Sequence, residues 1–154
     1  MVKHSPLLVG DAGCGKTQIS KGLLNDLTSI NNPEHMQQII NFNYYTDSSL
    51  LQSSLEQLLQ KKAGTLYGPP GKFTLICLVD ALNMPRLDPY NTQTAIALLR
   101  QHKDYEHWYD RAKLTIKDVK NTMYLGCMNP TAGSFFVNPR LQRHFWLLAV
   151  SFPE

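Results

Sequence analysis

The stretch Gly10-Asp11-Ala12-Gly13-Cys14-Gly15-Lys16-Thr17 decides the fold of this 154-residue chain. It has the spacing G-x-x-x-x-G-K-[ST], and each fixed position has a physical task. The glycines let the backbone curl until successive N–H groups point inward, where they can bind phosphate oxygens. The lysine can neutralise the β- and γ-phosphates of a nucleotide, and the threonine hydroxyl can ligate Mg²⁺. The eight residues therefore predict a P-loop that binds ATP or ADP with Mg²⁺.

The segments on either side of this loop fit the same interpretation. Pro6 to Val9 is a short apolar strand, and the pattern after the loop predicts a helix from about Lys16 to Leu27. The expected apolar face of that helix consists of Ile19, Leu23 and Leu27, with Leu24 beside it. A strand before the loop and a helix after it are what a P-loop requires, because the helix adds its positive N-terminal end to the phosphate site.

The rest of the chain alternates between strand-like and helix-like segments, which predicts α/β architecture. The expected strands are Ile39 to Tyr44, Leu75 to Val79, Met123 to Met128 and Phe145 to Val150. Helices are expected from the N-cap Asp47 to about Leu59 and from Thr92 to His102, with a short helix or turn at Arg140 to His144. Residues 61–72 are expected to be a loop or surface insertion, and Leu114 to Ile116 could pair with the stretch after Asp118 in a short hairpin. The run Leu75 to Val79 is apolar without alternation, so it should be a central strand covered on both faces. Five strands with helical crossovers place a ligand at the carboxyl ends of the strands.

Composition excludes several classes of protein. Apolar residues make up 43% and charged residues 18%, which is typical of one soluble globular domain. The net charge of +3 is too small to predict nucleic acid or an acidic membrane as a partner. No apolar run approaches the ~18 residues of a membrane-spanning helix. The three cysteines form no CxxC pair, so neither a disulfide framework nor a zinc cluster is expected, and a reducing compartment is predicted. The histidines have no metal-ligand spacing, and Tyr105, Trp108 and Tyr109 are expected to form an aromatic packing cluster.

Asp80 ends the apolar strand, in the arrangement of a Walker B aspartate, where a carboxylate can hold Mg²⁺ opposite the P-loop. The next residue is Ala81, whereas many ATPases of this type place a carboxylate there to orient or deprotonate the attacking water. Alanine can do neither. One alternative is that another residue supplies the base. The simpler hypothesis is that the site binds nucleotide and hydrolyses it slowly or not at all.

Three further polar residues lie next to predicted strands, at positions where ATPases use such residues. Asn129 follows the strand Met123 to Met128 and is predicted to act near the γ-phosphate, although a turn-forming Asn before a proline is the alternative. The predicted catalytic set is thus Lys16, Asp80 and Asn129. Arg140 and Arg143 precede the last strand and are candidates for an arginine finger on a neighbour's phosphates, with a solvated basic turn as the alternative.

With these residues in place, the chain resembles the AAA+ modules of dynein heavy chains, and most closely the third AAA+ module of an axonemal heavy chain. Beyond the P-loop, the resemblance lies in the segments Asn41 to Thr46, Lys61 to Gly64, Tyr67 to Gly71, Asn83 to Pro85, Arg100 to His102, His107 to Asp110, Cys127 to Phe135, Arg140 to Phe145 and Ser151 to Pro153. The resemblance covers nearly all 154 residues, and these segments taken together are highly specific.

The resemblance implies a large AAA+ subdomain with parallel strand order 5-1-4-3-2 and helices on both faces. Lys16 and Thr17 carry over as Walker A residues, Asp80 as the Walker B aspartate and Asn129 as sensor 1. One of the two arginines, Arg140 or Arg143, would reach the nucleotide of the preceding module. Thr17 and Asp80 would hold the Mg²⁺.

The implied parent is a six-module ring motor that moves toward microtubule minus ends and bends cilia, so its location would be cytoskeletal, in the axoneme. Its partners would be the neighbouring AAA+ modules, dynein intermediate and light chains, and microtubules. The third module in that family is usually a regulatory nucleotide site. Two other functions stay open: a structural ring segment that binds nucleotide without turnover, and a module of a non-motor remodelling ATPase.

The chain departs from the family pattern in two places. An acidic residue is usual where this chain has Ala81, which puts hydrolysis in doubt. Residues 1–154 also read as a single large subdomain without the C-terminal helical lid. Because core strands are expected close to both ends, we interpret the sequence as a fragment or short isoform of something larger, of marginal stability alone.

Overall fold

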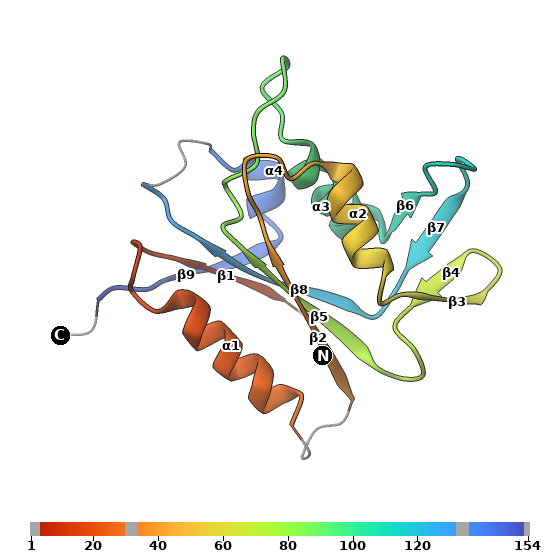
Figure 1. The fold of residues 1–154 in the computed structure, drawn as a ribbon, viewed down its shortest axis with the longest axis horizontal. Helices are drawn as coiled ribbons and strands as arrows, with labels where there is room; N and C mark the ends of the chain where they lie inside the picture. The colour runs from red at the N-terminus through yellow and green to blue at the C-terminus, as the bar shows by residue number, and fades with distance from the viewer. Residues whose placement is uncertain (1–3, 30–33, 132–135, 153–154) are drawn as a thin grey trace.

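The computed structural model describes residues 4–29, 34–131 and 136–152, and a five-stranded parallel sheet forms its centre (Figure 1). In sheet order the strands are β2 (His35–Asn41), β5 (Thr74–Asp80), β8 (Thr122–Met128), β1 (Ser5–Val9) and β9 (Phe145–Ala149). Every neighbouring pair runs parallel, so the carboxyl ends of the strands meet at one edge. If these five strands are numbered 1 to 5 in chain order, the sheet reads 5-1-4-3-2 from β9 to β2. The expected fold class and strand order are therefore confirmed.

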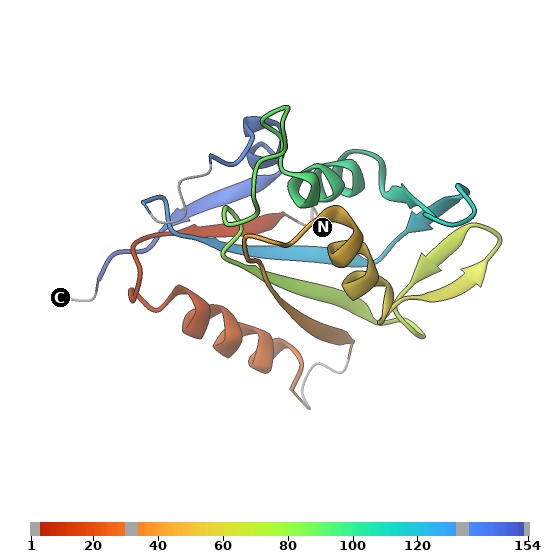
Figure 2. The same ribbon diagram turned by 45° about the horizontal axis from the view of Figure 1, so that its top comes forward.

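Helices cover both faces of this sheet. Figure 2 shows one helix below the sheet and the other three above it. The helices are α1 (Lys16–Leu27), which lies alone on its face, and α2 (Ser48–Glu56), α3 (Thr94–Tyr105) and α4 (Pro139–Gln142). The bounds of α1 match the prediction. Each crossover returns the chain to the same end of the sheet, so the loops that follow the strands gather at the P-loop end.

The buried face of α1 differs from the one expected from its apolar residues. Ile19 and Leu23 are 56% and 48% exposed, whereas Ser20 and Leu24 are buried. The buried side chains follow Lys16 at spacings of four and eight residues, so they lie on the same side of the helix as the lysine. The need to direct Lys16 into the P-loop therefore fixes the rotation of the helix, and this constraint overrides the apolar periodicity.

A second, four-stranded sheet extends the molecule beyond the expected five strands. Its order is β3 (Gln60–Ala63), β4 (Leu66–Gly68), β7 (Ile116–Val119) and β6 (His107–Tyr109). The expectation of a loop or surface insertion at 61–72 missed the hairpin of β3 and β4 that occupies the first part of this segment. The hairpin expected between Leu114 to Ile116 and the stretch after Asp118 is wrong, because Ile116–Val119 forms the single strand β7 and its antiparallel partner is β6. Strands of three or four residues are too short to give a period, and all of β3 is exposed.

Turn chemistry accounts for the shifted bounds of other elements. The strand expected at Ile39 to Tyr44 is β2, which starts earlier and ends at Asn41. Asn43 ends it by accepting a hydrogen bond from the Tyr45 N–H at 2.9 Å, as an Asx-turn does. Asp47 caps α2 as expected, since its side chain accepts from the Leu50 N–H at 2.8 Å.

The core has two parts, one on each face of the central sheet. Alternate residues of β5 supply both: Leu75, Cys77 and Val79 pack with α2 and α3, while Ile76 and Leu78 pack with Leu24 of α1. The prediction that this strand is covered on both faces is therefore confirmed. Its terminal residue, Asp80, emerges from the core at the loop edge of the sheet.

The aromatic cluster expected around Trp108 is buried only in part. Trp108 is 1% exposed and lies edge-on to His102, with ring centroids 4.9 Å apart. His102 contacts the Tyr124 hydroxyl at 2.7 Å and the Val119 carbonyl at 3.0 Å, and burial lowers its pKa to about 4, so its ring is neutral. Tyr105 and Tyr109 were expected in this packing, but they are exposed.

Two of the family-like segments extend outside the described residues. Residues 132–135 and 153 belong to this undescribed part of the chain. Within the described residues, no helix combines the length and apolar character needed to cross a bilayer.

Candidate functional site

The P-loop connects β1 to α1, at the loop edge of the central sheet. Gly13 and Gly15 both have φ of +86°, a left-handed conformation that L side chains rarely adopt. Gly15 is the N-cap residue of α1 and has no side chain to bond the first turn. The first N–H groups of a helix have no partner inside the helix, so they are available to an anion in the loop.

Lys16 extends back across the loop that precedes it. Its ammonium donates to the Gly10 carbonyl at 2.8 Å and to the Asp11 carbonyl at 2.6 Å, and it lies 3.4 Å from the Cys14 Sγ. The residue is 8% exposed. A nearly buried cation held only by neutral acceptors favours an anionic ligand, because phosphate oxygens would supply the charge that carbonyl oxygens lack.

Thr17 and Asp80 lie together although 63 positions separate them in sequence. The Thr17 hydroxyl donates to Asp80 Oδ2 at 2.8 Å, and the other carboxylate oxygen accepts from the Ala81 N–H at 2.9 Å. A hydroxyl and a carboxylate are hard oxygen ligands, which is the donor set that Mg²⁺ prefers. The two residues predicted to hold the metal are thus brought together, and their chemistry fits it.

Ala81 has a left-handed backbone, with φ of 55°. A non-glycine residue in this region stores strain of about 1 kcal/mol or more, and such strain often accompanies a functional site. Its side chain is a methyl group, which can neither orient nor deprotonate water. The position therefore keeps a special backbone geometry without the carboxylate that many ATPases place there.

Asn129 follows β8 and lies at the same pocket. Its side-chain oxygen accepts from the N–H and the hydroxyl of Thr131, at 2.9 and 2.8 Å. This leaves the side-chain amide N–H₂ as the group that it can offer to a phosphate. The structure thus has both features weighed for this residue: a turn that its oxygen stabilises, and a position beside the P-loop.

These residues line one pocket of about 280 Å³. Its walls consist of Ala12, Gly13, Lys16, Thr17, Phe42, Asp80, Ala81, Asn83, Met84, Met128 and Asn129. The predicted P-loop, Walker B and sensor residues therefore meet around a single cavity.

Four residues of this pocket were not assigned a role from the sequence, namely Phe42, Asn83, Met84 and Met128. Asn83 is 3% exposed and donates from Nδ2 to the Asn129 carbonyl at 2.8 Å, which joins the loop after β5 to the loop after β8. Phe42 follows β2, and its N–H donates to the Asp80 carbonyl at 2.9 Å. The sequence signals that could have identified Asn83 are its place three residues after the Walker B aspartate and its membership in the family-like segment Asn83 to Pro85.

Arg140 and Arg143 do not line this pocket. Arg140 lies in α4, and Arg143 follows the helix and forms an ion pair with Asp104 of α3. His144 also contacts this carboxylate, at 2.7 Å. Desolvation alone would raise the pKa of Asp104, but the hydrogen bonds from Arg143 and His144 outweigh it and lower the pKa. Neither arginine therefore lines the nucleotide pocket of its own chain.

Comparison with known proteins gives the same assignment. Residues 1–153 match the family described as the P-loop containing dynein motor region. The chain is 51% identical over 147 residues to dynein axonemal heavy chain 17 of Mus musculus, and 55% identical over 148 residues to the dynein alpha chain of the flagellar outer arm of Chlamydomonas reinhardtii. Both alignments cover 96% of this chain. Dynein axonemal heavy chain 9 of Homo sapiens is 49% identical over 154 residues, or 99% of the chain.

The chain spans about 3% of the length of each of these relatives. Their names agree with the expected axonemal family, and the structure agrees with its fold. The chain belongs to the family of P-loop containing dynein motor regions, and it is a dynein AAA+ module of the large α/β type.

Proposed function

We propose that this chain binds Mg-ATP or Mg-ADP as an AAA+ module of a dynein heavy chain in a ciliary motor. The observation that carries the proposal is the 2.8 Å contact between the Thr17 hydroxyl and Asp80, in the pocket that also holds the Lys16 ammonium. A cation, a hydroxyl and a carboxylate thus lie together in one pocket, although Asp80 is far from the other two in sequence. This is the arrangement that a Mg-nucleotide needs.

Each residue would act on the nucleotide through groups that the structure positions. Lys16 would exchange the Gly10 and Asp11 carbonyls for β- and γ-phosphate oxygens, since both acceptors belong to the loop that cradles the phosphates. Thr17 and Asp80 would hold Mg²⁺, which neutralises charge on the phosphates when bound. Asn129 would direct its amide N–H₂ at the γ-phosphate. None of these interactions requires a rearrangement of the central sheet.

We further propose that the site is regulatory, as in the third module of the ring, with weak or no hydrolysis. Ala81 supports this, because binding contacts are present while the usual water-orienting carboxylate is absent. A structural segment that binds nucleotide permanently is the second candidate, and the same residue favours it. Membership in the dynein motor family argues against the non-motor remodelling ATPase.

Replacing Ala81 tests this proposal. In a longer chain with the following lid and module, Ala81→Glu should raise the rate of phosphate release by about tenfold or more, because a positioned general base contributes at least that much. The left-handed backbone adds little new cost, since alanine already bears it. Ala81→Gln is the matched control: it has the same length without the carboxylate and should leave the rate unchanged. Robust turnover in the parent that Ala81→Glu does not alter would contradict slow hydrolysis.

The proposed partners follow from the parent motor. They are the neighbouring AAA+ modules, dynein intermediate and light chains, and microtubules, with movement toward the minus end. The proposed location is the axoneme of a cilium, in agreement with the axonemal and flagellar names of the relatives. Neither a nucleic acid nor a membrane is proposed as a partner.

Of the two finger candidates, we propose Arg140 as the residue that reaches the neighbouring nucleotide. The Arg143 guanidinium is held by Asp104, and its Nε donates to the Arg140 carbonyl at 3.2 Å. These contacts tie the end of α4 to α3. Arg140 is exposed at the start of that helix, where the Asn138 side chain caps its N–H at 2.9 Å. Arg143 would therefore position the helix that presents Arg140.

Single alanine variants distinguish the two roles. Arg140→Ala should leave the melting temperature of this module unchanged and lower nucleotide turnover at the preceding module of the ring by about a hundredfold or more. Arg143→Ala should lower the melting temperature, because Asp104 would lose the guanidinium bonded to it and keep only His144 and the more distant Arg100. A loss of turnover with Arg143→Ala in a fully stable protein, and none with Arg140→Ala, would reverse the assignment.

A further inference from the structure

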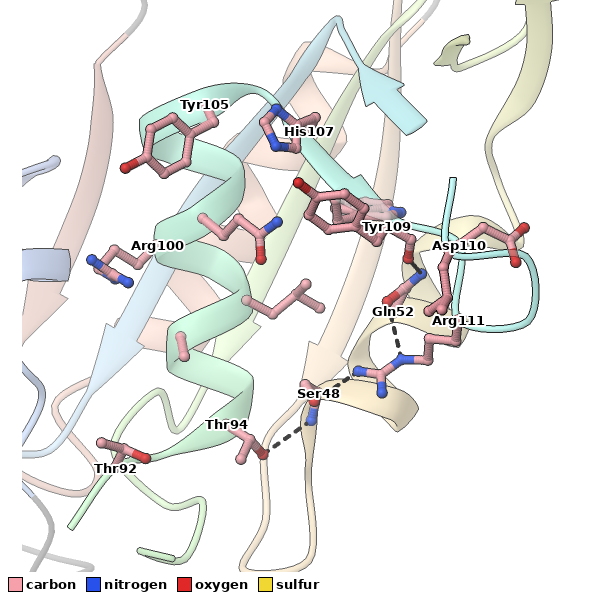
Figure 3. Close-up of a pocket in the computed structure, with 15 residues that line it drawn as sticks. Ser48, Gln52, Thr92, Thr94, Arg100, Tyr105, His107, Tyr109, Asp110 and Arg111 are labelled. Atoms are coloured by element: carbon pink, nitrogen blue, oxygen red, sulfur yellow. Dashed lines mark hydrogen bonds between the residues drawn. The ribbon is translucent and has the colours of Figure 1, made fainter. Parts of the chain in front are cut away.

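A groove of about 860 Å³ lies between α2, α3 and the loop that joins β6 to β7. Figure 3 looks into it, with α3 on one side and Arg111 on the other. Its volume is about three times that of the nucleotide pocket, and none of the described residues lines both. The groove is therefore separate from the nucleotide site.

Three rings stand in a row along one wall of the groove. Tyr105, His107 and Tyr109 have successive ring centroids 5.7 and 5.6 Å apart. The alternation of β6 places His107 and Tyr109 on the face opposite Trp108, which is buried in the core. The two tyrosines are 64% and 48% exposed. This wall offers apolar ring faces with polar tips, as protein interfaces commonly do.

The opposite wall holds a guanidinium in a fixed position. Arg111 donates from Nε to the Gln52 Oε1 at 3.1 Å and from Nη2 to the Ser48 Oγ at 2.7 Å. Gln52 is in turn fixed by donating to the Tyr109 carbonyl at 2.9 Å, and the Ser48 N–H donates to Thr94 at 3.2 Å (Figure 3). Both acceptors of Arg111 are neutral, so its charge is held in place without being compensated.

Among the described residues, one carboxylate lines the groove, and it is engaged by other groups. Asp110 accepts from the N–H groups of Ala112 and Lys113, both at 2.9 Å, and forms an ion pair with Lys117 at 3.1 Å. These backbone hydrogen bonds and Lys117 lower the pKa of Asp110 to about 2. Arg100, the other cation of the lining, has a carboxylate only at 3.9 Å, in Asp104. The groove as a whole therefore favours negative charge.

The rim of the groove also carries an apolar side chain, on a residue whose backbone is strained. Leu114 has φ of 53° and is 77% exposed at the tip of the β6–β7 loop. A bulky residue with positive φ costs about 1–2 kcal/mol, which the Leu114 N–H bond to the Asp110 carbonyl at 2.8 Å helps to offset. The loop thus displays a large apolar side chain beside the cation.

We propose that this groove binds an acidic peptide segment of a partner protein, in which a carboxylate pairs with Arg111 and a neighbouring apolar side chain packs between Tyr109 and Leu114. A planar guanidinium held by neutral groups can still bind a carboxylate with its remaining N–H bonds. The aromatic row supplies the contact area that orders the segment. This inference is independent of the nucleotide site.

The test uses a fluorescein-labelled peptide in which glutamate alternates with leucine and tyrosine, titrated with the intact chain and followed by anisotropy. Arg111→Gln should weaken its binding by about tenfold or more. Lys113→Gln is the matched control, since it removes the same charge from the same loop outside the groove and should change affinity by less than about twofold. Tyr109→Ser retains the carbonyl that Gln52 binds, and should weaken binding several-fold even if Arg111→Gln does not fold.

Three results would overturn the proposal. One is equal affinity for a peptide with every glutamate replaced by glutamine, which would remove the role of charge. Another is an equal loss with Arg111→Gln and Lys113→Gln, which would mean unspecific attraction. The third is displacement of the peptide by inorganic phosphate or a single-stranded RNA at lower concentration than by unlabelled peptide, which would assign the groove to a different ligand.

Discussion

Lys16→Ala is expected to weaken the binding of both ATP and ADP by about a hundredfold or more, which corresponds to about 2.7 kcal/mol. The ammonium is the cation nearest the loop that cradles the phosphates, and its two carbonyl contacts, at 2.8 and 2.6 Å, place it at the mouth of that loop. Alanine leaves the phosphates with neutral donors alone. The dissociation constants can be measured by titration calorimetry with Mg²⁺ present.

The fold should survive this substitution, because Lys16 contacts only its own loop. The rise in melting temperature caused by saturating nucleotide should therefore disappear, while the melting temperature without nucleotide changes little. Lys21→Ala is the matched control: the residue lies in the same helix, outside the pocket, and its loss should leave both dissociation constants unchanged. Tight binding retained by Lys16→Ala would contradict the P-loop assignment.

The part of the site that could be predicted from sequence is the part whose geometry a short motif determines. A strand, a glycine-rich turn and a helix place Lys16 and Thr17 at the carboxyl edge of a parallel sheet. Asp80 lies at the same edge because it ends β5, which β8 separates from β1. Asn83 and Phe42 were not found, because loop residues reach a pocket through contacts between distant segments. Their backbone and side-chain bonds to Asn129 and Asp80 become visible only in three dimensions.

The errors in the fold arose where tertiary contacts override local pattern. Ile19 and Leu23 suggested an apolar face for α1, yet the direction of Lys16 fixes the rotation of that helix. The strands of the second sheet are too short to show a period, and its two hairpins are joined by the pairing of β4 with β7, which are far apart in sequence. The groove of Arg111 was missed for a related reason, since Tyr105 and Tyr109 were assigned to packing.

Gly10→Ala is expected to lower the free energy of unfolding by about 3 kcal/mol. A Cβ at this position would lie 2.2 Å from the Val150 carbonyl oxygen and 2.9 Å from the Cys14 Sγ. The first contact is with backbone, which cannot rotate away as a side chain could. Val150 is itself fixed, because its N–H donates to the Val9 carbonyl at 2.8 Å and so continues the pairing of β9 with β1.

Relief of this clash must therefore move either the start of the P-loop or the end of the last strand. Either movement also disturbs Lys16, whose ammonium binds the Gly10 carbonyl, so nucleotide affinity should fall together with stability. Gly22→Ala is the matched control, since a Cβ there meets nothing within 4 Å and alanine should stabilise α1 by about 0.5–1 kcal/mol. Urea unfolding of both variants measures the difference. If Gly10→Ala were as stable as the parent, β9 could not be packed against the P-loop as described, because the space that glycine leaves there is too small for a methyl group.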